Sequence, residues 1–268
     1  MNKTENEILK AFYDKKALIA YLTAGDPAIE NSEEFIYALA QNGADLIEIG
    51  IPFSDPVAEG EVIQNAMTRA LNNKIGLDDI FDMVSRIRKK TDVPLAFMTY
   101  LNPLLTYGYD KFFKKCAETG ICALIAPDMP FEEQTEVKEF ADKYGITIIT
   151  LIAPTSTDRI EMLAKSAKGF IYLVSSLGVT GMRTEINADI NSIVSKIKKV
   201  TGIPVAVGFG ISSGQQAKEI SKYADGVIIG SAIVKIIEQY KENAAAKLAE
   251  YISSIRKEMD NKISTKTL

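Results

Sequence analysis

The chain has 268 residues, of which 47% are hydrophobic and 25% are charged, and its formal net charge is −4 at pH 7. This composition is typical of a globular protein with a sizeable core, and the acidic balance argues against a nucleic-acid-binding surface, which would carry a basic patch. No apolar run has the length of a membrane span, and the N-terminal segment lacks a signal peptide's apolar core, so we expect a cytoplasmic protein.

The chain contains two cysteines, Cys116 and Cys122, and no histidine. Two cysteines are too few for a disulfide framework, and without histidine they are poor material for a zinc site. We therefore expect two buried free thiols and no metal site. If the protein is an enzyme, its acid–base chemistry has to rest on groups other than histidine.

Eight short apolar runs recur along the chain. They are ALIAYL (17–22), DLIEIG (45–50), VPLAFM (93–98), CALIAP (122–127), TIITLI (147–152), FIYLVS (170–175), IPVAVG (203–208) and GVIIGS (226–231). Each run is rich in Ile, Val and Leu and is apolar almost throughout, which is typical of strands buried on both faces of a parallel sheet. Several of them follow a glycine that suits the end of a preceding helix.

Amphipathic helical patterns lie between these runs. One is NSEEFIYALAQ (31–41), in which Asn31 is a plausible N-cap with Glu34 three residues later. A further helical stretch, Glu5 to Tyr13, precedes the first run and is expected to cover the bottom of the fold. Eight strands alternating with helices predict a single-domain (β/α)8 TIM barrel over residues 1–268, with an extra N-terminal helix. The count of eight, and the lack of a glycine-rich dinucleotide loop after the first strand, weigh against an open doubly wound sheet.

Glu48 lies in the middle of an expected strand, between Ile47 and Ile49. An unpaired buried carboxylate costs several kcal/mol or shifts its pKa, so this position needs an explanation. One explanation is a structural ion pair inside the barrel. The other is a general acid or base with a raised pKa, and we favour it because barrel enzymes place catalytic groups at the carboxyl ends of strands.

The turn after this strand, PFSDPVAEGE (52–61), carries three more carboxylates. Asp55 stands in Ser-Asp-Pro, which is ordinary turn chemistry. Glu59 precedes Gly60 and a helical pattern, so it either complements a helix N-terminus or reaches over the mouth of the barrel.

Three glycine-bearing loops follow the last three expected strands, at residues 175–182, 208–213 and 229–233. Barrels commonly hold phosphate at the loops after strands seven and eight and at the N-terminus of a short helix. Glycine lets backbone N–H groups approach an anion, and the helix dipole favours it. The pattern therefore favours a bound phosphate over ordinary turns, and it requires no basic side chain.

Tyr172 lies centrally in the sixth expected strand, where its ring suits the core and its hydroxyl group needs a partner. Apolar side chains near other strand ends, including Tyr21, Tyr100, Leu151 and Phe209, either pack in the core or line a flat pocket. These residues together predict a barrel enzyme that acts on a phosphorylated substrate with carboxylate acid–base groups.

Several motifs in order give the chain a close resemblance to the tryptophan synthase α-subunit family. They are YLTAGDP (21–27), ADLIEIGIPFSDPVAEG (44–60), IQNA (63–66), MTYLNPLLTYG (98–108), APDMPFEE (126–133), LVSSLGVTG (173–181), VGFGIS (207–212) and ADGVIIGSAIVKIIE (224–238). The family cleaves indole-3-glycerol phosphate to indole and D-glyceraldehyde 3-phosphate in tryptophan biosynthesis, which is a carbon–carbon lyase reaction of retro-aldol type.

The resemblance implies a role for each matching residue. Glu48 matches the general acid–base, Glu59 matches a carboxylate that assists at the indole N–H, and Tyr172 matches a tyrosine near both. The residues implied for phosphate are Gly210, Gly230 and Ser231, those implied for a mobile closing loop are Thr180 and Gly181, and those implied for the indole pocket are Tyr21, Tyr100, Leu151 and Phe209.

The resemblance also implies no cofactor in this chain and a partner, the pyridoxal-phosphate-bearing β subunit, in an αββα heterotetramer that passes indole through a tunnel. We expect the partner to bind at Pro52, Asp55 and the Asn102-Pro103 turn. One departure stands out: where the family pattern reads SDPxADGP, this chain reads SDPVAEGE. Glu59 thus replaces an aspartate and Glu61 a proline, and our hypothesis is that Glu59 keeps the aspartate's role.

Three alternatives stay open at this point. The first is a stand-alone lyase that releases free indole, and the second is a weakly catalytic regulatory partner of the β subunit. The third is another phosphate-sugar barrel enzyme, such as an epimerase or an aldolase. The lack of a Schiff-base lysine at a strand end and of histidine metal ligands argues against the third.

Overall fold

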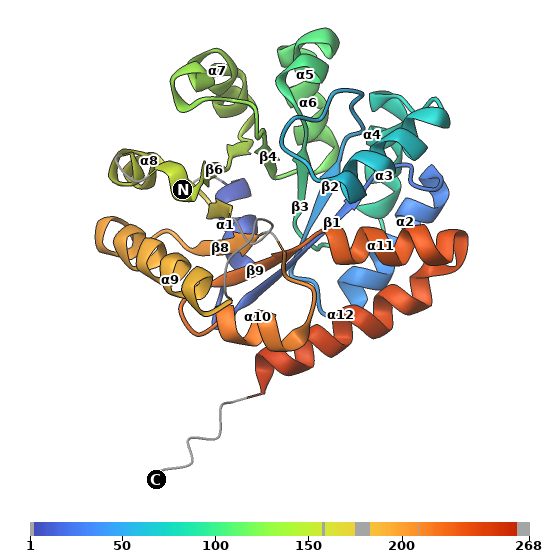
Figure 1. Ribbon diagram of the computed structural model, residues 1–268. Coiled ribbons are helices and arrows are strands. Elements are labelled where there is room, and N and C mark those ends of the chain that lie inside the picture. The colour runs from blue at the N-terminus through green and yellow to red at the C-terminus, as the bar shows by residue number, and fades with distance from the viewer. Residues whose placement is uncertain (1–2, 157–158, 175–182, 209, 262–268) are drawn as a thin grey trace.

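The computed structural model describes residues 3–156, 159–174, 183–208 and 210–261, and its parallel strands form a barrel surrounded by helices (Figure 1). The strands are β1 (Ala17–Thr23), β2 (Leu46–Gly50), β3 (Leu95–Met98), β4 (Ala123–Ile125), β5 (Thr147–Ile148), β6 (Thr150–Ile152), β7 (Ile171–Val174), β8 (Val205–Gly208) and β9 (Gly226–Ile229). Each of the eight predicted apolar runs forms a strand.

The strand order is β5-β4-β3-β2-β1-β9-β8-β7-β6, and every neighbouring pair is parallel. The two ends of this order, β5 and β6, are parts of one predicted strand that are separated by Ile149 alone. β5 pairs with β4 and β6 pairs with β7, so this strand passes from one neighbour to the other where the barrel closes. The predicted (β/α)8 barrel is therefore confirmed, with its fifth strand divided in two.

The helices pack around the outside of the strands. They are α1 (Lys3–Lys10), α2 (Ile29–Gln41), α3 (Glu61–Asn72), α4 (Leu77–Ile87), α5 (Leu101–Tyr107), α6 (Tyr109–Thr119), α7 (Gln134–Tyr144), α8 (Ile160–Ser166), α9 (Arg183–Val200), α10 (Gly214–Ile220), α11 (Ser231–Tyr240) and α12 (Ala244–Asp260), with short 3-10 turns at Phe131–Glu133, Pro154–Ser156 and Lys241–Asn243. Among the described helices, none combines the length and apolar character needed to cross a membrane.

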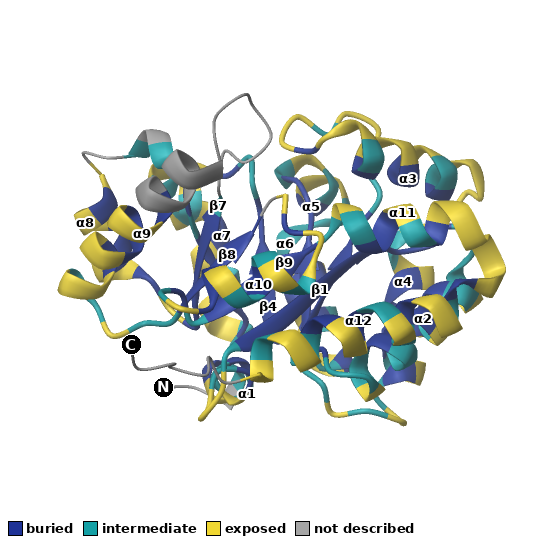
Figure 2. Ribbon diagram, turned by 60° about the horizontal axis from the view of Figure 1, so that its bottom comes forward, coloured by how far each residue is buried: buried dark blue, intermediate teal, exposed yellow. Residues whose placement is uncertain are grey.

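The extra N-terminal helix lies at one end of the strands, as Figure 2 shows for α1. Ile8 of this helix is fully buried and belongs to the same hydrophobic cluster as the side chains inside the barrel. Just beyond the helix, the rings of Phe12 and Phe170 lie 5.6 Å apart between centroids. The helix thus covers the bottom of the barrel, at the amino ends of the strands, as predicted.

The predicted N-cap at Asn31 is wrong. α2 begins two residues earlier, at Ile29, and its N-cap residue is Ala28, which makes no side-chain capping bond. Ser32 takes a related role instead, because its hydroxyl oxygen accepts the N–H of Gly25 at 2.8 Å. The loop before the helix is thus held by a side chain from the helix's first turn.

Side chains alternate along each strand between two hydrophobic layers. In β2, Ile47 and Ile49 belong to the outer layer between strands and helices, whereas Leu46 belongs to the inner layer that fills the barrel. Glu48 therefore faces the interior, away from its isoleucine neighbours in the sequence. Cys116 and Cys122 are both buried free thiols, as predicted.

Candidate active site

Glu48 is fully buried inside the barrel, and neither of its carboxylate oxygens has a hydrogen-bond partner among the described residues. In the sheet it stands opposite Tyr21 of β1 on one side and Ala96 of β3 on the other. Burial raises the pKa of Glu48 to about 8, and the negative charge of Glu59 adds to the shift. The alternative of a structural ion pair finds no cationic partner in the described part of the chain, and a protonated carboxyl group is favoured at neutral pH.

Glu59 lies two residues before α3, whose N-cap is Gly60, and it is 9% exposed. Its carboxylate accepts a hydrogen bond of 3.4 Å from the hydroxyl group of Tyr100, and that hydroxyl oxygen accepts the N–H of Ala58 at 3.2 Å. Burial raises the pKa of Glu59 to about 7, while the bond from Tyr100 opposes the rise. Each of the two carboxyl groups can therefore take up or release a proton near neutral pH, which is what acid–base catalysis without histidine requires.

Tyr21 and Tyr172 are seated against glycines of neighbouring strands. A Cβ atom added to Gly50 would lie 2.2 Å from the hydroxyl oxygen of Tyr21, and one added to Gly208 would lie 2.7 Å from that of Tyr172. Such contacts are too short for any side chain, so both positions require glycine for the rings to fit. The hydroxyl groups of Tyr21 and Thr23 lie 3.2 Å apart, whereas burial and the charge of Glu48 hold the pKa of Tyr172 well above its usual range.

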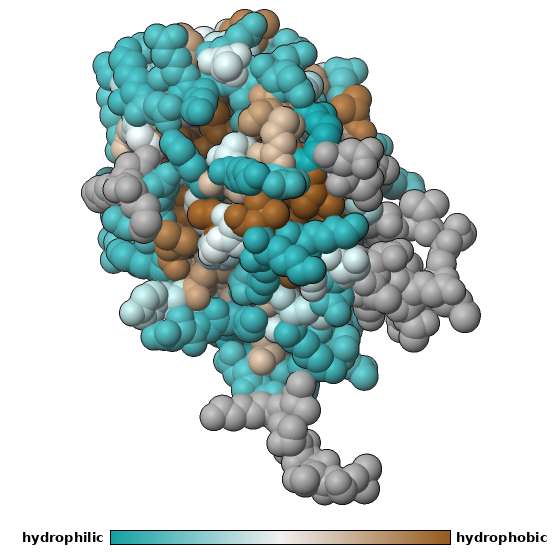
Figure 3. Space-filling view, turned by 90° about the vertical axis from the view of Figure 1, so that its left-hand side faces the viewer, coloured by the Kyte–Doolittle hydropathy of each residue, from teal (hydrophilic) through white to brown (hydrophobic). Residues whose placement is uncertain are grey.

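Two cavities meet at this cluster, and Glu59, Met98 and Tyr172 line both of them. The first has a volume of about 300 Å³ and is largely apolar, with Leu151 and Met129 among its walls. The loops after β4 and β6 supply much of its wall. Figure 3 shows the side of the molecule on which α7 and α8 lie, where hydrophobic residues gather in a recess edged by hydrophilic ones. A cavity of this kind suits a flat aromatic group.

The second cavity has a volume of about 250 Å³ and is bounded by Tyr21, Gly210, Gly230 and Ser231. Gly230 is the N-cap of α11 and Ser231 its first residue, so the free N–H groups of the helix lie at this wall. Gly210 has a φ of +75°, in the left-handed region that favours glycine. The wall offers the backbone donors and dipole that bind a phosphate group.

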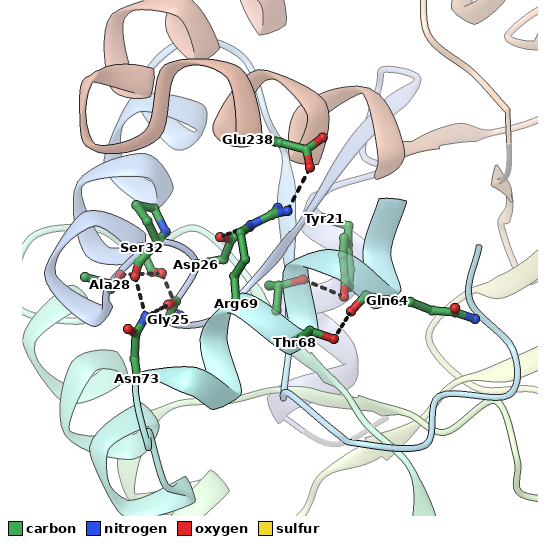
Figure 4. A network of polar contacts seen from close by, with 12 residues as sticks. Tyr21, Gly25, Asp26, Ala28, Ser32, Gln64, Thr68, Arg69, Asn73 and Glu238 are labelled. Carbon is green, nitrogen blue, oxygen red and sulfur yellow. Dashed lines mark hydrogen bonds and ion pairs between the residues drawn. The ribbon is translucent and has the colours of Figure 1, made fainter. Parts of the chain in front are cut away.

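The helix that follows Glu59 is anchored at its other end. Arg69 of α3 forms a two-pronged ion pair with the buried Asp26 after β1, at 2.8 Å for both contacts, and also bonds Glu238 of α11 at 2.9 Å (Figure 4). Asn73, just past the end of α3, donates to the carbonyl oxygen of Gly25 at 3.1 Å. These bonds fix α3 against both the β1 loop and α11.

The structure separates the predicted site residues into groups. Glu59, Tyr172, Tyr21, Leu151, Gly210, Gly230 and Ser231 line one or both cavities. Tyr100 lines neither, and instead holds Glu59 through its hydroxyl group. Glu48 also lies behind the cavity surface, because it is fully buried. Thr180, Gly181 and Phe209 lie outside the described residues.

Several residues that shape the site were missed by reasoning from the sequence. Gly50 and Gly208 seat the two tyrosines. The signal for the glycines was present, because each ends a strand, but their use depends on which ring leans over them. Lys235, an exposed residue four positions after Ser231 in α11, also lines the second cavity, and no motif singled it out.

Comparison with known proteins places the chain in one family. Residues 9–264 match the family model described as tryptophan synthase alpha chain. The tryptophan synthase alpha chain of Lacticaseibacillus casei is 46% identical, with 96% of this chain and 97% of that protein covered. That of Thermoanaerobacter sp. strain X514 is 43% identical over 96% of this chain and 99% of that protein.

Solved structures give the same result. Tryptophan synthase subunit alpha from Campylobacter jejuni superposes with a TM-score of 0.84 at 39% identity, over 92% of this chain and 98% of that one. A chain of the tryptophan synthase complex from Pyrococcus furiosus gives 0.81 at 33% identity, over 90% and 98%. Sequence and fold agree over nearly the whole length, and the chain belongs to the tryptophan synthase alpha chain family.

Proposed function

We propose that this chain cleaves indole-3-glycerol phosphate to indole and D-glyceraldehyde 3-phosphate, with Glu48 and Glu59 as its acid–base groups. The observation that carries the proposal is the pair of buried carboxyl groups, with pKa values raised to about 8 and about 7, beside two cavities of different character. The apolar cavity suits the indole ring, and the glycine-bearing cavity suits the phosphate group. Membership of the family supports the same reaction.

The reaction needs two proton transfers, one to the ring before the bond breaks and one from a hydroxyl group as it breaks. Protonated Glu48 gives its proton to C3 of the indole ring, and ionised Glu59 stabilises the positive charge that develops at the ring nitrogen. The Glu48 carboxylate then removes the proton from the hydroxyl group on the carbon bonded to C3. The C–C bond breaks, its electron pair returns to the ring, and the products are indole and an aldehyde. Glu48 is left protonated for the next cycle.

Glu48 has to move for this chemistry, because it is fully buried in the structure and lines neither cavity. A glutamate side chain has three rotatable bonds, so a rotamer change is enough to bring the carboxyl group to the surface of the site. Protonation lowers the cost of holding the group in its buried position. We propose that substrate binding draws the side chain outward, toward Tyr172.

The altered turn is compatible with a working site. Glu61, where the family pattern has proline, is the exposed first residue of α3. Proline and acidic residues both suit the first turn of a helix, for different reasons: proline has a suitable φ, and an acid complements the dipole. With its extra methylene, the carboxylate of Glu59 still lies inside the site and is held there by the hydroxyl group of Tyr100 at 3.4 Å. We propose that Glu59 serves where other members use aspartate.

We further propose that the chain acts as a single domain in the cytoplasm, without a cofactor of its own, paired with a β subunit that carries pyridoxal phosphate in an αββα assembly. The similar Pyrococcus furiosus structures are described as a tryptophan synthase complex and an α2β2 complex. Val57 and Leu105, close in sequence to the residues predicted to bind the partner, are 81% and 63% exposed. Asn102 and Pro103, expected in a turn, lie instead in the first turn of α5.

The first test is steady-state cleavage of indole-3-glycerol phosphate by the purified chain, alone and with a tryptophan synthase β subunit. Slow cleavage that rises strongly with the partner is expected. Fast cleavage without a partner would identify a stand-alone lyase, and none in either condition would favour a weakly catalytic regulatory role. Asp55→Ala and Asn102→Ala are expected to weaken activation by the partner while they leave the basal rate unchanged.

A further inference from the structure

Lys235 occupies a position in the second cavity that the reaction as described does not use. It lies on α11, four residues after Ser231, and it lines the same cavity as Gly210 and Gly230. Residues four apart in a helix share one face, and side chains in a helix lean toward its N-terminus. We therefore expect the side chain of Lys235 to extend toward the N-terminal end of α11, where the free N–H groups lie.

The ammonium group has no protein partner in the described part of the chain. Many lysines of this protein form ion pairs with carboxylates, such as Lys198 with Asp225 at 2.8 Å, but Lys235 forms neither an ion pair nor a hydrogen bond with a described residue. Its acidic helix neighbour Glu238 is instead bonded to Arg69 at 2.9 Å. Its three donors are free to take up an anion.

Two backbone donors near this cavity are already in use. The N–H groups of Ser212, which lines the cavity, and of its neighbour Ser213 both donate to the side-chain oxygen of Gln216, at 2.9 and 3.2 Å. Glu59 lines the same cavity and, when ionised, repels a phosphate dianion. A positive charge on the α11 wall of the cavity would offset this repulsion and favour an orientation of the substrate with its phosphate group toward α11.

We propose that Lys235 contacts the phosphate group of the substrate and sets the preference of this site for phosphorylated over unphosphorylated indole glycerol. This inference rests on the proposed function, and it adds a side-chain cation to a site otherwise built from backbone groups. Lys235 is exposed, so solvent screens the contact. We expect an effect of about three- to tenfold on binding, in the range of partly exposed charge pairs.

The test compares Lys235→Met, which keeps the aliphatic stem, with Lys235→Arg, which keeps the charge. Lys196→Met is the matched control, because Lys196 is exposed on α9 and does not line this cavity. For indole-3-glycerol phosphate, Lys235→Met should raise KM about three- to tenfold with kcat nearly unchanged, the signature of binding lost equally in ground and transition states. Lys235→Arg and Lys196→Met should resemble the unaltered chain. Indole glycerol without phosphate should be cleaved equally by all four proteins.

Binding of inorganic phosphate, followed by calorimetric titration of the same proteins, makes the outcome independent of turnover. Weaker phosphate binding by Lys235→Met alone supports the inference, even if no protein cleaves the substrate and the proposed function fails. Equal KM values and equal phosphate binding across all four proteins would overturn the inference. It would also be overturned if none of the four proteins bound phosphate. A loss in Lys235→Met that is the same for the unphosphorylated compound would also overturn it, because it would indicate a general structural effect.

Discussion

The hydroxyl group of Tyr100 donates a hydrogen bond of 3.4 Å to the carboxylate of Glu59 and accepts the backbone N–H of Ala58 at 3.2 Å. One side chain from the end of β3 thus holds two successive residues of the loop that carries the second carboxylate. The contact is made with the ionised form of Glu59, so it opposes the rise in the pKa of Glu59 that burial causes.

Tyr100→Phe is expected to lower kcat/KM about tenfold, the effect of losing one hydrogen bond to a charged group. Without the donor, the pKa of Glu59 rises further above about 7, so the acidic limb of the pH–rate profile moves to higher pH. The measurement is kcat/KM from pH 5 to pH 9. Tyr37→Phe is the control, since that hydroxyl group bonds Glu33 on the outside of the barrel. An unchanged profile in Tyr100→Phe would show that the hydrogen bond does not influence Glu59.

Two substitutions test the role of Glu59, one that removes its charge and one that shortens its side chain. Glu59→Gln keeps the size and loses the charge, so we expect a loss in kcat of a hundredfold or more, in the range for removal of a positioned acid–base group. Glu59→Asp restores the family residue and should keep most of the activity, with any loss within about a hundredfold because the group is displaced by roughly 1 Å.

Asp55 is the alternative bearer of this role. Its carboxylate is bonded by Ser54 at 2.5 Å, is exposed, and lines neither cavity. Asp55→Asn should therefore leave basal cleavage unchanged. Near-normal turnover in Glu59→Gln, together with a large loss in Asp55→Asn, would transfer the function from one to the other.

Burial of Glu48 also makes the stability of the protein depend on pH. The pKa of Glu48 is raised from 4.5 to about 8 in the folded protein, so the folded state holds a proton that the unfolded state has already released. The contribution of Glu48 to the free energy of unfolding is therefore fully present below about pH 4.5 and is lost as the pH rises toward 8. Glu48→Gln cannot ionise and so removes this loss. The free energy of unfolding of the variant, minus that of the unaltered protein, should therefore be about 3–5 kcal/mol larger at pH 8.5 than at pH 5.

Urea unfolding of both proteins at the two pH values measures this difference. Comparison across pH cancels any packing cost of the amide group itself, which is the same at both values. Glu34→Gln is the control, because Glu34 is exposed on α2 and its replacement should have the same small effect at each pH. A difference for Glu48→Gln that does not change with pH would mean that Glu48 is not held in its protonated form.

Gly208→Ala tests the seating of Tyr172. The added methyl carbon would lie 2.7 Å from the tyrosine ring and hydroxyl oxygen, so the ring has to shift. We expect a loss of about 1–3 kcal/mol in the free energy of unfolding, as for overpacking elsewhere, and a clear fall in kcat because Tyr172 lines both cavities. Gly202→Ala is the matched control, since a Cβ there meets nothing within 4 Å. If Gly208→Ala and Gly202→Ala are equally active, catalysis does not require the Tyr172 ring to keep its position.

Much of the fold was determined by local pattern in the sequence. Continuous runs of Ile, Val and Leu identified each strand, because a strand covered on both faces cannot expose polar residues on either. The carboxyl ends of those strands identified Glu48, Glu59 and the glycine-bearing loops as candidates, because barrel strands all present these ends at one face. The misplaced N-cap at Asn31 shows the limit of such patterns, since the helix begins at Ile29 without a side-chain cap and Ser32 instead accepts the N–H of Gly25 in the preceding loop.

Only the tertiary structure decided which way Glu48 faces and what surrounds it. In the sequence it stands between two isoleucines, but strand alternation turns those outward and places the carboxyl group inside the barrel, near Tyr21 and Tyr172. The same holds for Tyr100, which a sequence pattern assigns to a pocket wall and the fold places behind Glu59. These relationships join residues that are tens of positions apart in the chain, and they depend on register and closure of the barrel, which no local run of residues specifies.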